Sequence, residues 1–148
     1  MPSALPDGLE AGTLNGPGIA GLGAGCRELL SIGLPTVQER ISRLKVRLWD
    51  GLSSIDGVQV LSPRARDGGG IVTLVPRQGD PARLAHSLDR AHGVLGRAGL
   101  HCAPEAHGLL GTLETGALRL SVGWGAEEQD VDRALEAVDR CVVSGSIP

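Results

Sequence analysis

Apolar residues recur every three or four positions in three stretches of the chain, which is typical of amphipathic helices. The first stripe consists of Val37, Ile41, Leu44, Leu48, Leu52 and Ile55. It follows Thr36-Val37-Gln38-Glu39, whose spacing is that of a capping box and predicts a helix start. Asp80 and Pro81 predict the cap and first turn of a second helix, with Leu84, Leu88 and Ala91 as its stripe. The last helix is expected from about Glu127 to Val142, with the inward residues Val131, Leu135, Val138 and Val142.

A glycine-rich apolar segment precedes these helices. Gly18 to Ile32 is expected to be helical, with Pro17 near its start and Gly33 as its stop. Each internal glycine costs about 0.5–1 kcal/mol in a helix, so this helix is expected to pack closely against another backbone. Residues 1–16 are rich in Pro, Gly and Asp and are expected to form an irregular arm.

The remaining apolar segments are short and predict strands. Val58–Leu61 and Gly70–Val75 flank the turn sequence Arg66–Gly69, which favours an antiparallel pair. Val94–Ala98 is a short candidate strand, and Ala117–Val122 is a better one. In the latter, alternation places Leu118, Leu120 and Val122 on one face and Arg119 and Ser121 on the other. Strands interleaved with helices predict an α+β two-layer sandwich, a small and mainly antiparallel sheet covered by helices.

Composition narrows the picture further. A length of 148 residues suggests one domain, and the absence of Phe and Tyr requires an aliphatic core. A net charge of −3 gives no clustered positive field, so neither a nucleic-acid nor a membrane partner is expected. The N-terminal residues lack a signal-peptide pattern and no apolar stretch would span a bilayer. The three cysteines cannot form a complete disulfide set, which suits a cytoplasmic protein.

The candidate chemistry lies between Arg97 and His107, where the chain reads RAGLHCAPEAH. Cys102 lies in a loop beside His101, and cationic neighbours favour the nucleophilic thiolate. Cys26 and Cys141 are instead expected to be small buried apolar residues on their helices. Arg119 could bind a carboxylate with two hydrogen bonds, or it could be an ordinary solvated strand residue.

Two other site types are disfavoured. Adjacent His101 and Cys102, with His107, offer awkward geometry for zinc and no second ligand pair, so no metal is expected. Gly16-Pro17-Gly18-Ile19-Ala20-Gly21 matches the dinucleotide fingerprint, but residues 9–15 do not read as the buried strand that this fingerprint needs. A helix start with glycines for close packing is the simpler interpretation.

Four segments carry a family resemblance, in the family's order. They are Leu9–Asn15 with Ile19–Ala24, Arg97–Pro104, Gly116–Ser121 and Glu127–Asp132. Together they resemble the class V (fold type I) aminotransferases that depend on pyridoxal 5'-phosphate (PLP), in particular cysteine desulfurases with a short cysteine loop. The resemblance runs from about residue 6 to 142 and implies that residues 17–148 are the family's C-terminal small domain.

The resemblance implies roles for individual residues. Cys102 would attack the sulfur of a substrate such as cysteine and become a persulfide, while Arg119 would hold the substrate carboxylate. Arg97 and His101 would lie on the substrate side, with Arg97 supporting the cysteine loop. Gly12 and Thr13 would reach the PLP phosphate of a neighbouring subunit. A homodimer, the large domain and a sulfur-acceptor protein are the implied partners.

The chain departs from the family pattern at individual residues and in the domains that it contains. Leu14 replaces the proline after Gly-Thr, Gly96 stands where a strand residue is usual, and Trp124-Gly125-Ala126 replaces the family's signal before the last helix, which predicts a weaker cap. The large domain with its PLP-binding lysine is absent from this sequence. Lys45, the only lysine, lies on the flank of an amphipathic helix.

We therefore expect a fragment or split-gene product that is inactive alone. A stand-alone thiol or persulfide carrier and a non-catalytic dimerisation module remain alternatives. Desulfurase and aminotransferase activities are also not separated by these residues.

Overall fold

The computed structural model describes residues 4–9, 12–64 and 69–143. The chain divides into two compact units, Met1–Val37 and Gln38–Pro148. Among the described residues, no helix is both long and apolar enough to cross a membrane.

The first unit contains a short 3-10 helix, η1 (Asp7–Leu9), and helix α1 (Gly16–Ile32). The predicted helix is confirmed, although it begins two residues earlier, because Asn15 Oδ1 accepts a hydrogen bond of 3.0 Å from Gly18 N. Gly33 ends it with φ 91°, as predicted. No side chain of α1 is buried, so the close packing expected for its glycines is not supplied by this unit.

Helix α2 (Leu34–Ser54) begins before the predicted capping box. Val37 N donates to Gly33 O at 3.2 Å, so Thr36 lies inside the first turn and does not cap the helix. The prediction of the cap was wrong because Gly33 both stops α1 and provides the first carbonyl of α2.

The second unit is built on a sheet of strands β1 (Val58–Val60), β2 (Ile71–Pro76), β4 (Ala117–Ser121) and β3 (Arg97–Gly99), in that spatial order. All three neighbouring pairs are antiparallel. The predicted turn at 66–69 falls largely outside the described residues. The strand expected at 94–98 is shifted to β3, because Val94 N is already bonded to Leu88 O at the end of the preceding helix.

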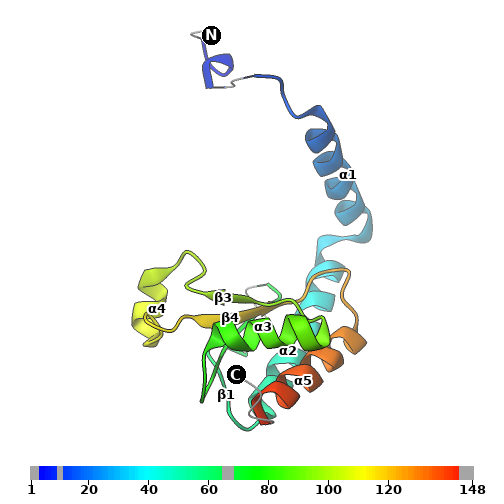
Figure 1. Cartoon of the computed structure of the whole chain (residues 1–148). Helices are drawn as coiled ribbons and strands as arrows, with labels where there is room; N and C mark the ends of the chain where they lie inside the picture. The colour runs from blue at the N-terminus through cyan, green and yellow to red at the C-terminus, as the bar shows by residue number, and fades with distance from the viewer. Residues whose placement is uncertain (1–3, 10–11, 65–68, 144–148) are drawn as a thin grey trace. The chain divides into compact units, whose positions relative to one another are not determined.

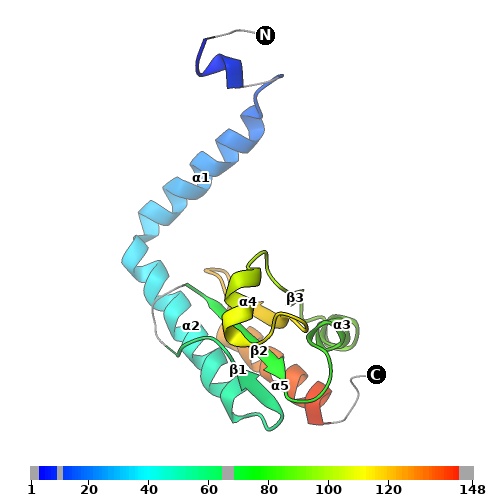
Figure 2. The same cartoon turned by 90° about the vertical axis from the view of Figure 1, so that its left-hand side faces the viewer.

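Helices α2, α3 (Pro81–His92) and α5 (Glu128–Val143) cover one face of this sheet (Figures 1 and 2). We call it the helix face. Its strand residues are fully or nearly fully buried, and they are Val58, Val72, Leu74, Leu118 and Leu120. The helices contribute the buried Leu44, Leu48, Leu52, Leu84, Leu88, Val131 and Val138. This arrangement confirms the α+β two-layer prediction and the aliphatic core.

The predicted helix stripes are largely correct. Asp80 Oδ1 accepts from Ala82 N at 2.6 Å and caps α3 as expected. Ala91, predicted to face the core, is exposed instead because α3 ends at His92 and its apolar stripe closes with Leu88.

The segment before α5 is held by contacts that the sequence did not reveal. The Arg40 guanidinium lies 5.1 Å from the centre of the Trp124 ring, and its Nη2 donates to Ala126 O at 2.9 Å. Glu127 N donates to Asp130 Oδ2 at 3.0 Å. The expected weakening of this cap is therefore offset by Arg40 and Asp130.

Candidate functional site

The face of the sheet turned away from the helices carries the polar strand residues, and we call it the opposite face. Thr73, Arg119 and Arg97 stand side by side across β2, β4 and β3, since each is the register partner of the next. Side chains of register partners project to the same side of a sheet. Two guanidinium groups predicted from separate motifs are thus brought together on adjacent strands.

A close backbone approach at one end of β3 and β4 leads into the cysteine loop. A side chain at Gly116, where φ is 68°, would place its Cβ 2.7 Å from Gly99 Cα. Gly99 itself has φ 111°. At Gly116 only glycine permits both the positive φ and the contact, whereas at Gly99 the positive φ alone favours glycine.

The cysteine loop, which we define as residues 100–103, contains an unusual turn. His101 (φ 53°) and Cys102 (φ 60°) are both in the left-handed region, where residues with side chains are uncommon. Each such residue costs roughly 1–3 kcal/mol, and such strain is concentrated at functional sites. The turn leaves the Cys102 thiol exposed.

Two contacts tie this turn to β3. Arg97 Nη2 lies 3.9 Å from Cys102 Sγ, within hydrogen-bonding range for sulfur. His101 Nε2 lies 2.8 Å from the backbone oxygen of Arg97. The structure therefore brings together Cys102, His101 and Arg97, and Arg97 pairs with Arg119 on the neighbouring strand.

Arg119 has an unsatisfied donor. Its side chain is half-buried, and its buried Nε has no hydrogen-bond partner. Arg40 Nε shares this property, but the Arg40 guanidinium is committed to Ala126 and Trp124. An unmade hydrogen bond of a buried charged group is costly, and a bound carboxylate would satisfy it.

A short helix follows the cysteine loop and was not predicted. Helix α4 (Pro104–Leu110) begins with a proline and ends at Gly111, which has φ 71°. These two residues are the ordinary signals of a helix start and stop, so the sequence did contain the information. The helix buries His107, which is only 4% exposed.

The remaining predicted residues are placed as follows. Gly12 (φ 87°) and Thr13 belong to the first unit and are exposed. Cys141 is buried as expected, and burial raises the pKa of its thiol. The same expectation was wrong for Cys26, which is exposed because α1 buries no side chain.

In the described residues, no strand precedes the fingerprint at Gly16–Gly21. Among the described residues ahead of it there is only the turn η1, and Asn15 caps the helix start. Within the described part of the chain, no group of three or more His, Cys, Asp or Glu side chains could hold a metal ion.

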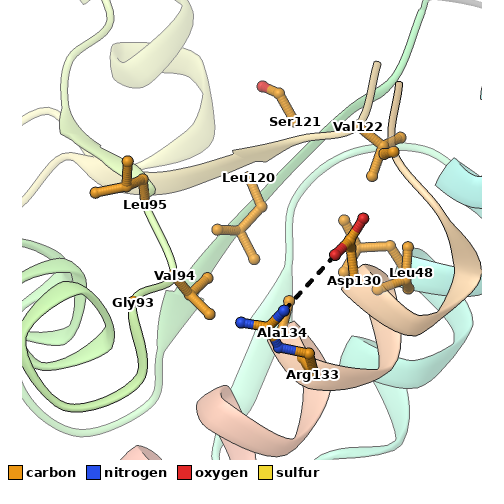
Figure 3. A pocket seen from close by; sticks show the side chains of 12 residues that line it. Leu48, Gly93, Val94, Leu95, Leu120, Ser121, Val122, Asp130, Arg133 and Ala134 are labelled. Carbon is orange, nitrogen blue, oxygen red and sulfur yellow. Dashed lines mark ion pairs between the residues drawn. The ribbon is translucent and has the colours of Figure 1, made fainter. Parts of the chain in front are cut away.

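A cavity of about 190 Å³ on the helix face was not predicted. Figure 3 shows Val94, Leu95, Leu120 and Val122 around it, with an ion pair of 3.8 Å between Arg133 Nη1 and Asp130 Oδ1. Its lining contains no thiol or imidazole. Neither Arg97 nor Arg119 lines this cavity.

Known proteins resemble this chain over most of its length. The model of the family "Aminotransferase class-V" matches residues 3–134. A probable cysteine desulfurase of Pseudomonas aeruginosa is 38% identical over 139 residues, which is 93% of this chain and 33% of that protein. A probable cysteine desulfurase of Methanothermobacter thermautotrophicus is 30% identical over 142 residues, 95% of this chain and 35% of that protein.

Solved structures give the same result. The apo structure of cysteine desulfurase from Thermococcus onnurineus NA1 matches with a TM-score of 0.83 and 30% identity, over 94% of this chain and 34% of that one. The cysteine desulfurase CsdA (S-sulfonic acid) from Escherichia coli matches with a TM-score of 0.80 and 27% identity, over 94% and 33%. The chain thus spans only 33–35% of the length of these relatives.

Proposed function

Because the chain belongs to the class-V aminotransferase family, we propose that it is the small-domain portion of a PLP-dependent cysteine desulfurase. In this role it supplies the sulfur-accepting thiol, Cys102, and the carboxylate-binding cation, Arg119. The observation that carries the proposal is the exposed Cys102 thiol in a left-handed turn. The thiol lies 3.9 Å from Nη2 of Arg97, which is the register partner of Arg119 on the neighbouring strand.

In the proposed step, the Cys102 thiolate attacks the sulfur of substrate cysteine. The new S–S bond forms as the substrate C–S bond breaks, and the electron pair of that bond goes to carbon, which takes up a proton and becomes the methyl group of alanine. Cys102 is left as a persulfide, so the two sulfur atoms together lose the two electrons that the carbon gains, and no outside oxidant is needed. Arg119 would hold the carboxylate through its unsatisfied Nε and orient the sulfur toward the loop.

The residues present fit the substrate end of such a site but not the covalent attachment of PLP. The only lysine, Lys45, is 2% exposed and lies on α2 next to the core residues Leu44 and Leu48. It therefore belongs to the helix layer, whereas Arg119 projects from the opposite face of the sheet. PLP supplies the electron sink in this chemistry, so we propose that its lysine comes from a polypeptide segment outside these residues and that this chain alone is inactive. Gly12 and Thr13 stay predicted contacts of the PLP phosphate.

The test compares this chain alone with the chain supplied with a polypeptide that carries the PLP-binding lysine. With PLP and cysteine, the chain alone should release no alanine and show no absorbance of covalently bound PLP. Complementation with the corresponding large portion of the Pseudomonas aeruginosa relative should yield alanine and a persulfide on Cys102. Cys102→Ser should abolish the persulfide, and Cys26→Ser is the matched control. Alanine release by this chain alone, or persulfide on Cys26, would overturn the proposal.

A persulfide carrier is the second candidate, favoured by the exposure of Cys102. In that case inorganic polysulfide should load Cys102 much faster than Cys26, which is also exposed, and the loaded chain should pass sulfur to a dithiol. Equal loading of both cysteines counts against the carrier.

A dimerisation module is the third candidate. It is favoured by the exposed apolar residues of α1, among them Ile19, Leu22 and Leu30, which are 61%, 71% and 69% exposed. Light scattering at increasing concentration tests it, and a mass that stays monomeric rejects it.

A further inference from the structure

The left-handed turn at His101 and Cys102 needs support from outside itself. Two consecutive residues with side chains hold positive φ values of 53° and 60°, a conformation that persists only when surrounding contacts impose it. The backbone bond from Ala103 N to Leu100 O, at 2.8 Å, closes the turn but does not anchor it to the rest of the fold.

The first anchor is His101. Its Nε2 lies 2.8 Å from Arg97 O, and a carbonyl oxygen can only accept, so Nε2 carries a proton and donates. This bond fixes the imidazole against the first residue of β3.

The second anchor is His107, whose ring lies against the ring of His101. The two imidazole rings are 5.6 Å apart between centres and inclined by 43°, a tilted aromatic contact. His107 is 4% exposed and its Nδ1 lies 2.8 Å from Thr112 Oγ1, while Thr112 N donates to His107 O at 2.9 Å. Thr112 is itself only 8% exposed. His107 is therefore held by hydrogen bonds at both its backbone and its side chain.

These contacts argue against a filler role for His107. His101 Nε2 and His107 Nδ1 are both already engaged in hydrogen bonds. An apolar side chain would fill the same volume without leaving a polar atom to satisfy. The chain that connects Thr112, His107, His101 and Arg97 ends beside Cys102 Sγ.

We propose that His107, fixed by Thr112, is a positioning residue that holds the His101–Cys102 turn and so sets the place of the Cys102 thiol beside Arg97, the register partner of Arg119. The proposal rests on the proposed function for its biological purpose, since it is the sulfur acceptor that is positioned. The placement itself is measurable on the thiol of this chain without cofactor or substrate.

The experiment measures alkylation of Cys102 by iodoacetate, which is anionic, and by iodoacetamide, which is neutral, with each cysteine resolved by mass spectrometry. Because the Arg97 guanidinium lies beside it, Cys102 should favour the anionic reagent more than Cys26 does. Thr112→Val replaces the hydroxyl that holds His107 by a methyl group, and it should lower this preference about 3-fold, toward that of Cys26, because the hydrogen bond to His107 is lost. His107→Leu should do the same, and Thr112→Ser should restore the wild-type preference.

The matched control is His86→Leu, which replaces an exposed histidine on α3 and should leave the reagent preference of Cys102 unchanged. Folded Thr112→Val and His107→Leu variants with an unchanged reagent preference would overturn the proposal. Nitrogen-15 spectra of the unmodified chain provide a test that needs no variant, since a neutral His101 protonated at Nδ1 rather than Nε2 would also overturn it. Loss of desulfurase activity in the complementation test would leave the reagent preference unaffected, so the two proposals fail separately.

Discussion

The two faces of one small sheet differ in what their residues do. On the helix face, Leu118 and Leu120 are 0% and 4% exposed and belong to a continuous aliphatic core. On the opposite face, the intervening Arg119 stands between Thr73 and Arg97, with an unsatisfied Nε. Alternate residues of a single strand thus serve stability and the proposed chemistry, because successive side chains project to opposite sides of a sheet. Changes on the two faces should be separable.

The largest expected difference is in the alkylation rates of two thiols, Cys102 in the cysteine loop and Cys141 in the core. Cys141 is buried on the helix face and burial raises its pKa, so its reactive thiolate is both scarce and covered. With iodoacetamide in native buffer, Cys102 should be alkylated at least about 10³-fold faster than Cys141, which is reached only through the small unfolded fraction. Equal alkylation rates for the two thiols in native buffer would contradict this expected difference. In concentrated urea the difference in rate should disappear.

Adjacent residues of β4 should separate stability from function. Leu118→Ala should lower the free energy of unfolding by about 2–5 kcal/mol, because it leaves a cavity where the side chain is fully buried. Arg119→Gln should cost less than about 1 kcal/mol, as for other substitutions outside the core. Urea titrations of the two variants provide the measurement. A large loss for Arg119→Gln would mean that the opposite face also carries the fold.

The junction between the faces and the loop can be tested at two glycines. Gly116→Ala should destabilise the fold by about 2–3 kcal/mol, since it adds a backbone clash with Gly99 to the strain of a positive φ. Gly111→Ala, also at positive φ but with nothing within 4 Å of the added Cβ, should cost only about 1 kcal/mol. Equal urea midpoints for these variants would show that β3 and β4 can separate at this end without penalty.

The smallest effect is expected at the surface of the helix layer. The hydrogen bonds from Arg47 lower the pKa of Asp132, and those from Arg64 lower the pKa of Asp50. A carboxyl whose pKa is lowered by folding stabilises the fold above its unfolded pKa of about 3.9, and this contribution is lost as the pH falls through the folded value. The urea midpoint should therefore decrease slightly between pH 5 and pH 2, and less so in Asp132→Asn. An identical acid dependence in this variant would contradict the ion pair's role.

Much of the fold could be predicted because its signals are local. Asp80 with Pro81 specifies a helix start through a hydrogen bond two residues away, and the alternation around Arg119 separates two faces without knowledge of the neighbouring strands. The failures occurred where a local signal had a nonlocal competitor. Val94 reads as a strand residue, but its N–H is used by the end of α3, and the capping box at Thr36 is superseded by Gly33.

The candidate site likewise has features that local sequence predicts and features that depend on contacts between distant segments. The sequence by itself determined the family, through four ordered motifs, and the residue types of the site, namely Cys102, Arg97, His101 and Arg119. Only the tertiary structure decided that Arg97 and Arg119 are partners on adjacent strands and that His107 is buried beneath His101. It also decided which thiols are covered. Residue chemistry and helix periodicity are written in neighbouring positions, whereas strand register, burial and the left-handed turn depend on contacts between segments that the sequence keeps apart.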